Sequence, residues 1–390
     1  MKPRFYGRGA AGFSLVELMV SIVIGLLAVL FATRMMTDSE RSKDGALGGS
    51  DSMQDGMMAM FSISADAEQA GFGLNDPILA GCDTAFSDDG GAGYALATVK
   101  RGTTDVEPLA AAVIVNGGAR PDTVSFYSGS AAGGTISVRL VGNYNGGSQI
   151  MIDRDPYGFA EGDVFVVAPE DGVGRCALAQ VSALTEGASP AISFNDTSDR
   201  YNTGELGRTF PGSATRVFNL GPAAGLSFHT WLVENGVLRL RATNLGQGDD
   251  TQAVADNIVS IKAQYGLDTR AGAAFDPEQG MQIGAWSNEM TDADGDGVTG
   301  GPGDYQRVAA IRLAVVARNR SPERPAAGGA CSVTTEPLTV FGSRQPSEVD
   351  AVPVELDLSD TGDGPDWTCY RYRAFETIVP LRNSGWRPTA

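Results

Sequence analysis

The chain has 390 residues and a formal net charge of −18, from 29 basic and 47 acidic residues. Such an acidic chain lacks the basic surface that general nucleic-acid binding requires, so no nucleic-acid partner is expected. The 51 glycines and the low share of charged residues, 19%, favour a loop-rich β structure over a helical bundle.

The first feature of the chain is an apolar run from Gly12 to Ala32. At about 1.5 Å per residue, its roughly 20 residues span a bilayer as one helix. Glu17 is the one charged residue inside the run. The residues before the run include three basic side chains and no acidic one: Lys2, Arg4 and Arg8. By the positive-inside rule, the chain after the helix lies outside the cytoplasm.

Three interpretations of this run compete. A secretory signal peptide has a shorter apolar core followed by a small-x-small cleavage site, and no clean Ala-x-Ala follows this run. A plain membrane anchor leaves Glu17 unexplained, because an intramembrane carboxylate costs about 2.5–3.5 kcal/mol on insertion scales and is usually functional. The third interpretation accounts for both Gly12 and Glu17.

The residues Gly12-Phe13-Ser14-Leu15-Val16-Glu17 resemble the processing motif of type IV prepilins. This resemblance implies that a prepilin peptidase cuts after Gly12 and removes residues 1–12 as a leader. It also implies that Phe13 becomes the N-methylated first residue, and that Glu17 pairs with the amino terminus of a neighbouring subunit during assembly. Such a pair would relieve the cost of placing the carboxylate in the membrane.

The four cysteines predict disulfides, because the compartment outside the cytoplasm is oxidising and their number is even. None forms a Cys-x-x-Cys pair and the chain has a single histidine, so a zinc site is not expected. Four cysteines allow three pairings. We favour the pairs that are nearest in sequence, Cys82 with Cys176 and Cys331 with Cys369.

A second helical segment, residues 37–74, is expected to follow the apolar helix of residues 13–36. Residues 37–52 contain three glycines and predict a frayed or interrupted helix, since each glycine costs about 1 kcal/mol relative to alanine. The next residues recur at spacings of three and four and predict an amphipathic helix that packs on a head. The stripe expected to make this contact comprises Met53, Met57, Met60, Phe61, Ser64, Ala67 and Glu68.

From residue 75 onward, short β-branched and aromatic runs are bounded by turn signals. The expected strands are residues 122–127, 136–141, 163–168, 177–181, 258–266, 307–317 and 370–382. Asn235-Gly236 predicts a hairpin between residues 227–233 and 237–241, with His229 as a strand residue. The strand at 307–317 is apolar enough to be central, and Pro380 predicts an edge position or an end for the last strand.

Three segments, residues 256–268, 307–318 and 370–383, resemble parts of the PilW-type minor pilins. Together with the N-terminal motif, this resemblance covers the start and the last third of the chain. It implies an α+β, type IV pilin-like fold, in which a long N-terminal helix packs on a large, mostly antiparallel β-sheet head of residues 75–390.

The resemblance implies a subunit that primes or caps type IV pilus assembly in a tip complex. Its partners would be other minor and major pilins, the prepilin peptidase, the inner-membrane assembly platform and a PilY-type tip adhesin. The chain would cross the inner membrane once, with a periplasmic head, and reach the pilus at the cell surface after assembly. The alternatives are a pseudopilin of a type II secretion system and a membrane-anchored, calcium-binding adhesive domain that does not polymerise.

The sequence lacks the Gly-x-Ser-x-Gly, His-Glu-x-x-His and Walker motifs, so we expect no enzymatic activity. One stretch, Asp292-Ala293-Asp294-Gly295-Asp296-Gly297, places three carboxylates at positions 1, 3 and 5 with a glycine at the turn, as in EF-hand-like calcium loops. The position-12 glutamate is missing, but Asp304 follows a flexible glycine-rich stretch. The expected Ca²⁺ ligands are Asp292, Asp294, Asp296, the backbone oxygen of Val298 and Asp304; the alternative is an acidic solvated turn.

Overall fold

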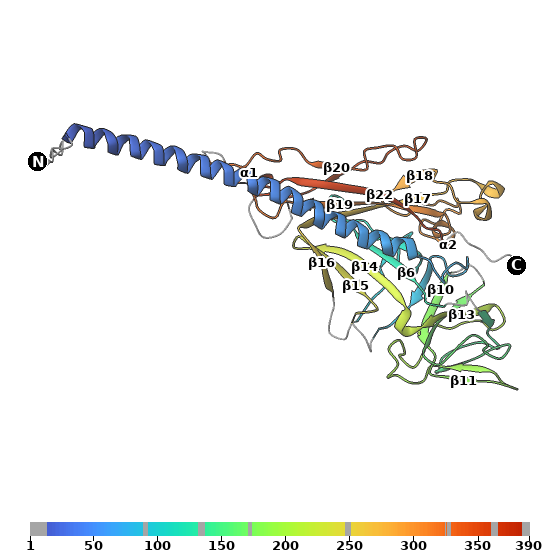
Figure 1. Cartoon of the computed structure of the whole chain (residues 1–390). Helices are drawn as coiled ribbons and strands as arrows, with labels where there is room; N and C mark the ends of the chain where they lie inside the picture. Colours follow the sequence, from blue (N-terminus) through green and yellow to red (C-terminus); the bar gives the residue numbers. More distant parts are fainter. Residues whose placement is uncertain are drawn as a thin grey trace, which may run out of the picture. The chain divides into compact units, whose positions relative to one another are not determined.

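The structure is a computed structural model that describes residues 14–88, 93–131, 137–170, 174–245, 251–323, 325, 329–359 and 366–383, without the side chains of residues 38 and 40–48. It divides into two units, one ending at Asp51 and the other beginning at Ser52. The helix α1 (Leu15–Gln69) begins in the first unit and ends in the second (Figure 1). The three glycines do not interrupt α1, contrary to the sequence prediction, because helix propagation is cooperative and tolerates isolated weak residues.

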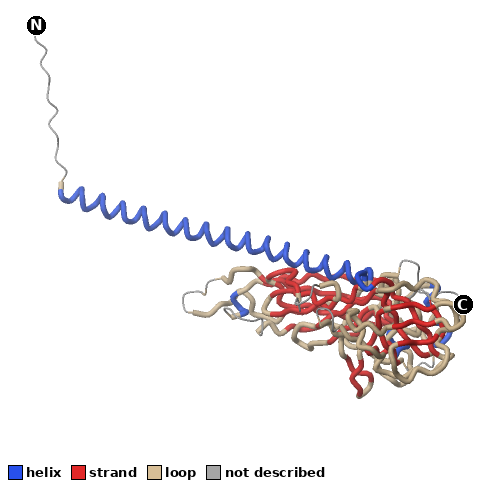
Figure 2. The backbone as a smooth tube through the Cα atoms, turned by 90° about the horizontal axis from the view of Figure 1, so that it is seen from below, coloured by secondary structure: helices blue, strands red, loops and turns tan. Residues whose placement is uncertain are grey.

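Strands and loops make up most of the second unit (Figure 2). The strands are β1 (Cys82–Ala85), β2 (Val99–Arg101), β3 (Thr104–Val106), β4 (Pro108–Leu109), β5 (Ala112–Val115), β6 (Thr123–Ser128), β7 (Ser137–Arg139), β8 (Gln149–Met151), β9 (Asp163–Pro169), β10 (Arg175–Gln180), β11 (Ala183–Thr185), β12 (Ala191–Ser193), β13 (Thr215–Pro222), β14 (Ser227–Glu234), β15 (Val237–Ala242), β16 (Gln252–Asp256), β17 (Ile258–Leu267), β18 (Ala285–Ser287), β19 (Val308–Arg318), β20 (Leu338–Val340), β21 (Val354–Leu356) and β22 (Tyr372–Pro380). The remaining elements are α2 (Pro302–Tyr305) and four 3-10 turns: η1 (Ala223–Gly225), η2 (Gly272–Ala274), η3 (Pro277–Gln279) and η4 (Trp367–Cys369).

Three larger sheets organise these strands, in the orders β4-β1-β10-β9-β13-β7, β16-β15-β14-β6-β5 and β18-β17-β19-β22. Smaller sheets are β11-β12-β8, β2-β3 and β20-β21. Among the described strands, β1 and β10 are the one parallel pair. The predicted fold, a long N-terminal helix with a mostly antiparallel β head, is therefore confirmed.

The four-stranded sheet confirms two placements made from the sequence. β19 lies between β17 and β22, as its unbroken apolar run predicts, and its residues from Val308 to Ala317 are buried. β22 is the edge strand, and Pro380 stands at its end. The hairpin of β14 and β15 also forms, with a positive φ of 52° at Asn235 and 75° at Gly236, as the Asn-Gly turn requires.

The face of α1 that packs on the head differs from the predicted stripe. The buried residues of this segment are small or β-branched: Ser52, Gly56, Ala59, Ile63 and Ala67 of α1, and Ala70 directly after it. Met53, Met57 and Phe61 of the predicted stripe are instead exposed by 45%, 53% and 76%. Small side chains let the helix approach the sheets closely; a Cβ placed on Gly56 would lie only 2.1 Å from a ring carbon of Phe375. The stripe prediction was thus right for Ala67 and Met60, which pack on the core, and wrong for Met53, Met57 and Phe61. Periodicity identifies an apolar stripe but does not say which side of it meets the head.

A second β structure is inserted between two strands of the five-stranded sheet. β6 and β14 pair directly, with Ser128 opposite Ser227. The chain between them forms β7 to β13, which we call the inserted lobe, and the lobe has its own buried core. The core includes Leu140, Ile152, Phe165, Phe194 and Val217. A bridge between Leu140 and Ile152 joins the β7 and β8 ends of this lobe.

Both predicted disulfides are present. Cys82 of β1 pairs with Cys176 of β10, which ties the inserted lobe to the segment that follows α1. Cys331 pairs with Cys369 and closes the segment that carries β20 and β21. This segment covers the face of β17 and β19 that is opposite α1, through the buried side chains of Val340, Phe341 and Leu356.

Candidate functional site: the N-terminal helix and the aspartate loop

Ser14 and Glu17 form a reciprocal cap at the start of α1. The Ser14 amide donates to Glu17 Oε2 at 3.2 Å, and the Val16 amide donates to Ser14 Oγ at 3.3 Å. The arrangement is close to the Ser-x-x-Glu capping box, with the amide of Val16 in place of that of Glu17, and it satisfies amides that the first helical turn leaves without partners. The sequence signature was visible, but Glu17 was assigned only a role between subunits. Gly12 and Phe13, the predicted processing residues, lie outside the described residues.

The first half of α1 has the length and composition of a membrane span. The span covers Leu15–Thr37, with a mean hydropathy of 2.7, and the structure buries none of it. Its hydroxyls are satisfied inside the helix: Ser21 Oγ donates to the Glu17 carbonyl and Thr33 Oγ1 to the Val29 carbonyl. Such internal bonding suits an apolar surrounding, where an unsatisfied polar group is costly.

The second half of α1 is fastened to the head by polar side chains. Asp66 Oδ2 accepts from Trp231 Nε1 at 2.8 Å and lies 2.7 Å from His229 Nδ1. The His229 Nε2 lies 3.1 Å from Ser227 Oγ. The same chain of groups occurs in serine hydrolases, but here the carboxylate oxygen is shared with the Trp231 indole at the helix–sheet contact. Asp66 therefore anchors α1 to β14.

Further polar contacts hold both ends of this helical segment. Ser52 Oγ donates to Asn319 Oδ1 at 3.3 Å, and Asn257 Nδ2 donates to Asp55 Oδ2 at 2.9 Å. Asn383 Nδ2 lies within 3.4 Å of the carbonyls of residues 68 and 69, the last of the helix, and of residue 70 after it. Such partners satisfy carbonyls that a helix end leaves free.

The solvent side of the same segment carries large apolar residues. Met53, Met57, Met58 and Phe61 are each at least 45% exposed. The helix thus turns its small residues to the head and its large ones outward. This exposed apolar row is a candidate interaction surface.

The aspartate loop lies between β18 and α2. The carboxylates of Asp292, Asp294 and Asp296 are exposed and lie within 4.8 Å of one another, so that this triad could bind a metal ion. Asp292 accepts from the amides of Gly295 and Gly297 at 2.8 and 3.0 Å. These bonds hold the turn with its carboxylates on one side.

Asp304 is not brought into this triad. It is buried, and its two carboxylate oxygens accept from four backbone amides of the loop at 2.6–3.2 Å, those of Ala293, Asp294, Gly300 and Gly301. Burial raises the pKa of the Asp304 carboxyl, although the amide bonds oppose this shift. Asp304 therefore closes the loop from behind rather than facing a cation beside the three aspartates. This loop closure has no local sequence signature.

The loop is also tied to the hairpin of β2 and β3. The Gly102 amide donates to the Thr299 carbonyl at 3.1 Å, and Arg101 Nε donates to the Gly300 carbonyl at 2.9 Å. The Arg101 guanidinium also donates to the Gly81 carbonyl, next to the Cys82 disulfide. The Val298 carbonyl, a predicted ligand, accepts from the Gly301 amide at 3.2 Å.

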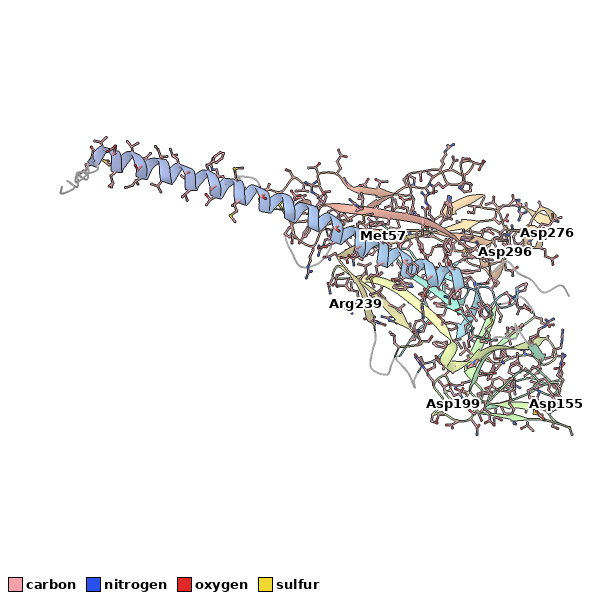
Figure 3. All side chains as sticks on the ribbon, viewed as in Figure 1. Met57, Asp155, Asp199, Arg239, Asp276 and Asp296 are labelled. Carbon is pink, nitrogen blue, oxygen red and sulfur yellow. A yellow bond between two sulfur atoms is a disulfide. The ribbon has the colours of Figure 1, made fainter. Side chains whose placement is uncertain are left out.

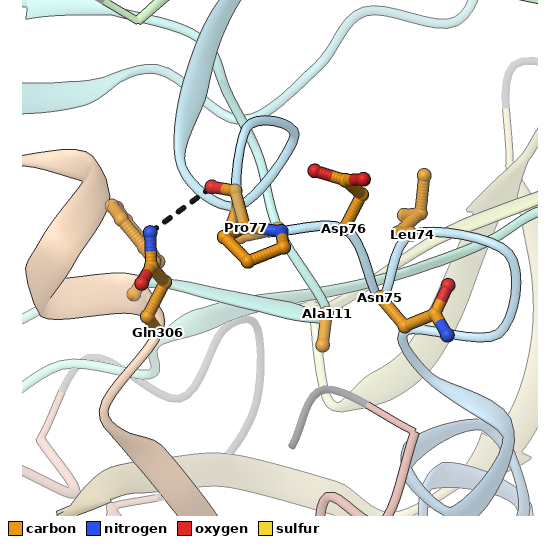
Figure 4. A pocket seen from close by; sticks show the side chains of 9 residues that line it. Leu74, Asn75, Asp76, Pro77, Ala111 and Gln306 are labelled. Atoms are coloured by element: carbon orange, nitrogen blue, oxygen red, sulfur yellow. Dashed lines mark hydrogen bonds between the residues drawn. The ribbon is translucent and has the colours of Figure 1, made fainter. Parts of the chain in front are cut away.

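A small pocket lies where the chain leaves α1 (Figure 4). Its lining includes Leu74, Pro77, Ala111 and Tyr305, and Gln306 Nε2 donates to the Pro77 carbonyl at 3.0 Å. Its volume of about 20 Å³ offers room for about one water molecule. We assign it no ligand.

The apolar helix and the motif at its start define a class of protein. Residues 7–33 match the prokaryotic N-terminal methylation motif, which is the mark of a membrane-anchored, prepilin-like chain. Residues 232–383 match the family of the type IV pilus-assembly protein W. The chain is thus a PilW-family type IV pilus-assembly protein, a prepilin-like minor pilin with the N-terminal methylation motif. This family is generally non-enzymatic, and it implies pilin and peptidase partners. No curated protein and no solved structure matches the chain.

The match to the PilW family runs from within β14 to just after β22. It contains the three segments, residues 256–268, 307–318 and 370–383, whose resemblance to PilW-type pilins was noted in the sequence. The inserted lobe lies outside both matches.

Proposed function

We propose that this protein enters a type IV pilus through α1 and primes or caps its assembly as part of a tip complex. The observation that carries the proposal is the apolar surface of α1. Nothing in the described structure covers the span of Leu15–Thr37, and the large residues of the head-packed segment face outward. A lipid bilayer can cover the span, but Met57 and Phe61 lie in the unit that begins at Ser52 and need a protein neighbour.

We infer that processing separates residues 1–12 from the mature chain. Cleavage after Gly12 would leave the apolar helix, residues 13–36, attached to residues 37–74 and to the head of residues 75–390. The new amino group of Phe13 would stand one residue before Ser14. Because Glu17 Oε2 already accepts from the Ser14 amide, the carboxylate is close to where this amino group would form.

The proposed role of Glu17 is to pair with the amino terminus of Phe13 in a neighbouring subunit. Inside one chain, the carboxylate needs only the Ser14 amide, which uses one of its two oxygens. A carboxylate can accept about four hydrogen bonds, so the remaining sites are open to a cation from a neighbour. Opposite charges would then favour one register of the helices.

The proposed partners are the proteins that would act on the chain during processing and assembly. The prepilin peptidase would cut on the cytoplasmic side, and the head would remain in the periplasm until the inner-membrane assembly platform inserts the subunit. Other minor and major pilins would cover α1, and a PilY-type adhesin would bind at the tip. The finished subunit would lie in the pilus at the cell surface.

We further propose that the ion of the aspartate triad is Ca²⁺, with Asp292, Asp294, Asp296 and the Val298 carbonyl as ligands. Hard oxygen ligands from an exposed, irregular loop suit calcium, which accepts six to eight oxygens at about 2.3–2.6 Å. Water would complete the shell. The bound ion would stiffen the connection between β18 and β19.

The test is to shear filaments from the surface of cells that carry the protein and to search them by mass spectrometry. The expected result is a peptide that begins with N-methylated Phe13 in the pilus fraction. Recovery only with a secretion pseudopilus would favour the pseudopilin alternative. Recovery of uncleaved chain in the membrane alone would favour the non-polymerising adhesive domain.

A variant of Glu17 makes the test specific to assembly. Glu17→Ala should insert into the membrane at least as well as the wild type, because it removes a charge from the span. It should nevertheless be depleted from filaments. Equal amounts of wild type and variant in sheared filaments would contradict the registering role.

A further inference from the structure

The outer side of β22 is an open strand edge. β22 pairs with β19, and no described strand pairs with its other side. The Asn319 amide donates to the Arg371 carbonyl, in the same register as the pairs of β22, so odd-numbered residues bond inward to β19. The main-chain groups that point outward include those of Ala374, Glu376 and Ile378.

The other edges of the larger sheets are short or irregular. β4, β5 and β18 have two, four and three residues, and β16 is paired across a bulge. β22 has nine residues in unbroken register with β19. Proteins normally protect such long edges with bulges, charges or proline. β22 carries the charged residues Arg373 and Glu376, but it has no bulge and Pro380 blocks only its end.

One flank of α1 borders this edge. Phe375 of β22 packs against Gly56, and a Cβ on Gly56 would lie 2.1 Å from its ring. On a helix surface, Met53 and Met60 are the neighbours of Gly56 at spacings of three and four. Met60 packs on the same core as Phe375, whereas Met53 stays exposed by 45%. Met57, labelled in Figure 3, stays exposed by 53%. The open edge and these methionines together form a surface that we call the β22 strip.

We propose that the β22 strip binds an extended segment of a different protein, which adds to the sheet as a strand beside β22. Main-chain hydrogen bonds to the outward groups of β22 would hold the segment. Alternate side chains of an added strand face one side of the sheet, so every second residue should be apolar and rest on Met53 and Met57. Methionine adapts its shape to such partners.

The charge of the strip adds one requirement for the segment. Arg373 of β22 is exposed and has no ion-pair partner among the described residues, whereas Glu376 is held by Arg312 Nη2 at 2.8 Å. In a chain of net charge −18, this free cation favours a segment with an acidic residue opposite Arg373.

Two copies of this chain do not pair their β22 edges with each other. Ser52 bonds to Asn319 near the start of β22, and Asn383 caps the end of α1 after the end of β22, so strand and helical segment run in the same direction. Two-fold pairing of two β22 edges would be antiparallel. The helical segments of the two heads, which begin at Ser52, would then run in opposite directions. Two chains anchored in one membrane by their N-terminal helices cannot be arranged in this way. This exclusion rests on the proposed role as a membrane-anchored pilin-like subunit.

The experiment uses the full-length protein in its own membranes, with a benzophenone amino acid in place of Thr377. After illumination, the crosslinked peptides are sequenced by mass spectrometry. The expected product joins β22 to one segment of another protein that alternates apolar residues and contains an acidic one. Ala374→Pro removes an outward amide and should lower the crosslink yield about tenfold, whereas Ala374→Thr keeps the amide and the yield.

A second pair of variants tests the helix side of the strip and does not depend on the strand. Met53→Lys should lower the yield, but Met58→Lys, which is equally exposed on another flank of α1, should not. Both disulfides and protease resistance report that each variant folds; if Ala374→Pro fails this check, the methionine pair decides. Crosslinks only to copies of the same chain, no crosslink, or equal yields within the matched pairs would overturn the proposal. Absence of the wild-type protein from sheared filaments, with the crosslink still formed, would instead contradict the proposed pilus role.

Discussion

Asp66 is predicted to contribute more to the attachment of α1 than any other polar residue of the helix. Its Oδ2 serves both Trp231 Nε1 and His229 Nδ1. Hydrogen bonds to charged groups contribute about 1.5–3 kcal/mol each, and a buried donor left without a partner costs about 1–3 kcal/mol. Trp231 is 2% exposed, so water cannot replace the lost acceptor. Asp66→Ala should therefore lower the free energy of unfolding by about 3–4 kcal/mol.

The assay is urea unfolding of the full-length protein in detergent, followed by tryptophan fluorescence. Asp66→Asn keeps one acceptor oxygen and should lose about half as much stability as Asp66→Ala. Glu68→Ala removes an exposed carboxylate from the same turn of the helix and is the matched control. If Asp66→Ala unfolds at the same urea concentration as Glu68→Ala, the anchor does not act as described.

Three further variants test other features. Gly56→Ala should destabilise the head by about 1–3 kcal/mol in the same urea assay, because its Cβ would overlap the Phe375 ring. Replacing both Cys82 and Cys176 by serine should remove roughly 4–5 kcal/mol in the chain-entropy model, seen as faster proteolysis of the inserted lobe. Calcium at a hundredfold excess over its dissociation constant should stabilise the wild type by about 2.7 kcal/mol, measured as a higher melting temperature, and Asp294→Ala should not respond.

Two of these variants have matched controls, and the disulfide variant has an outcome that would limit its role. Gly49→Ala places a methyl group where nothing lies within 4 Å, and should be neutral or stabilising by about 1 kcal/mol. Loss of the lobe's protease resistance without any change in urea midpoint would mean that the disulfide acts only locally. Asp276→Ala, in a separate exposed loop, should keep the calcium response. Equal melting of the wild type in calcium and in chelator would leave the triad as an acidic solvated turn.

Local sequence signals predicted the parts of the fold that depend on local chemistry. Asn235-Gly236 fixed the β14–β15 turn because its backbone conformation is demanded by the turn type. The long apolar run of β19 predicted a strand buried on both faces, and Pro380 predicted an edge. The cysteine pairs followed from the compartment and from nearness in sequence.

The features that were missed depend on contacts between distant residues. Short strands such as β8 and β12 have three residues each and carry too little periodicity to stand out. Whether Met57 faced the head or solvent could not follow from spacing, because small residues on the other face of α1 packed better. The burial of Asp304 likewise results from four amides of a folded loop, which the Asp-x-Asp-x-Asp pattern does not encode.

The junction at Ser128 and Ser227 has an evolutionary consequence. Because these residues are already paired neighbours, a stretch of coding sequence could be added or removed between them without shifting the register of β6 against β14. Families built on this plan can therefore differ by a whole lobe at one point of the gene while the rest of the subunit stays recognisable. Deletion of the lobe would also remove its contacts with β1. These contacts are the Cys82–Cys176 disulfide and the ion pair of Arg208 with Asp83. The lobe is thus joined to the rest of the subunit by a disulfide and an ion pair as well as by the two chain segments that enter and leave it.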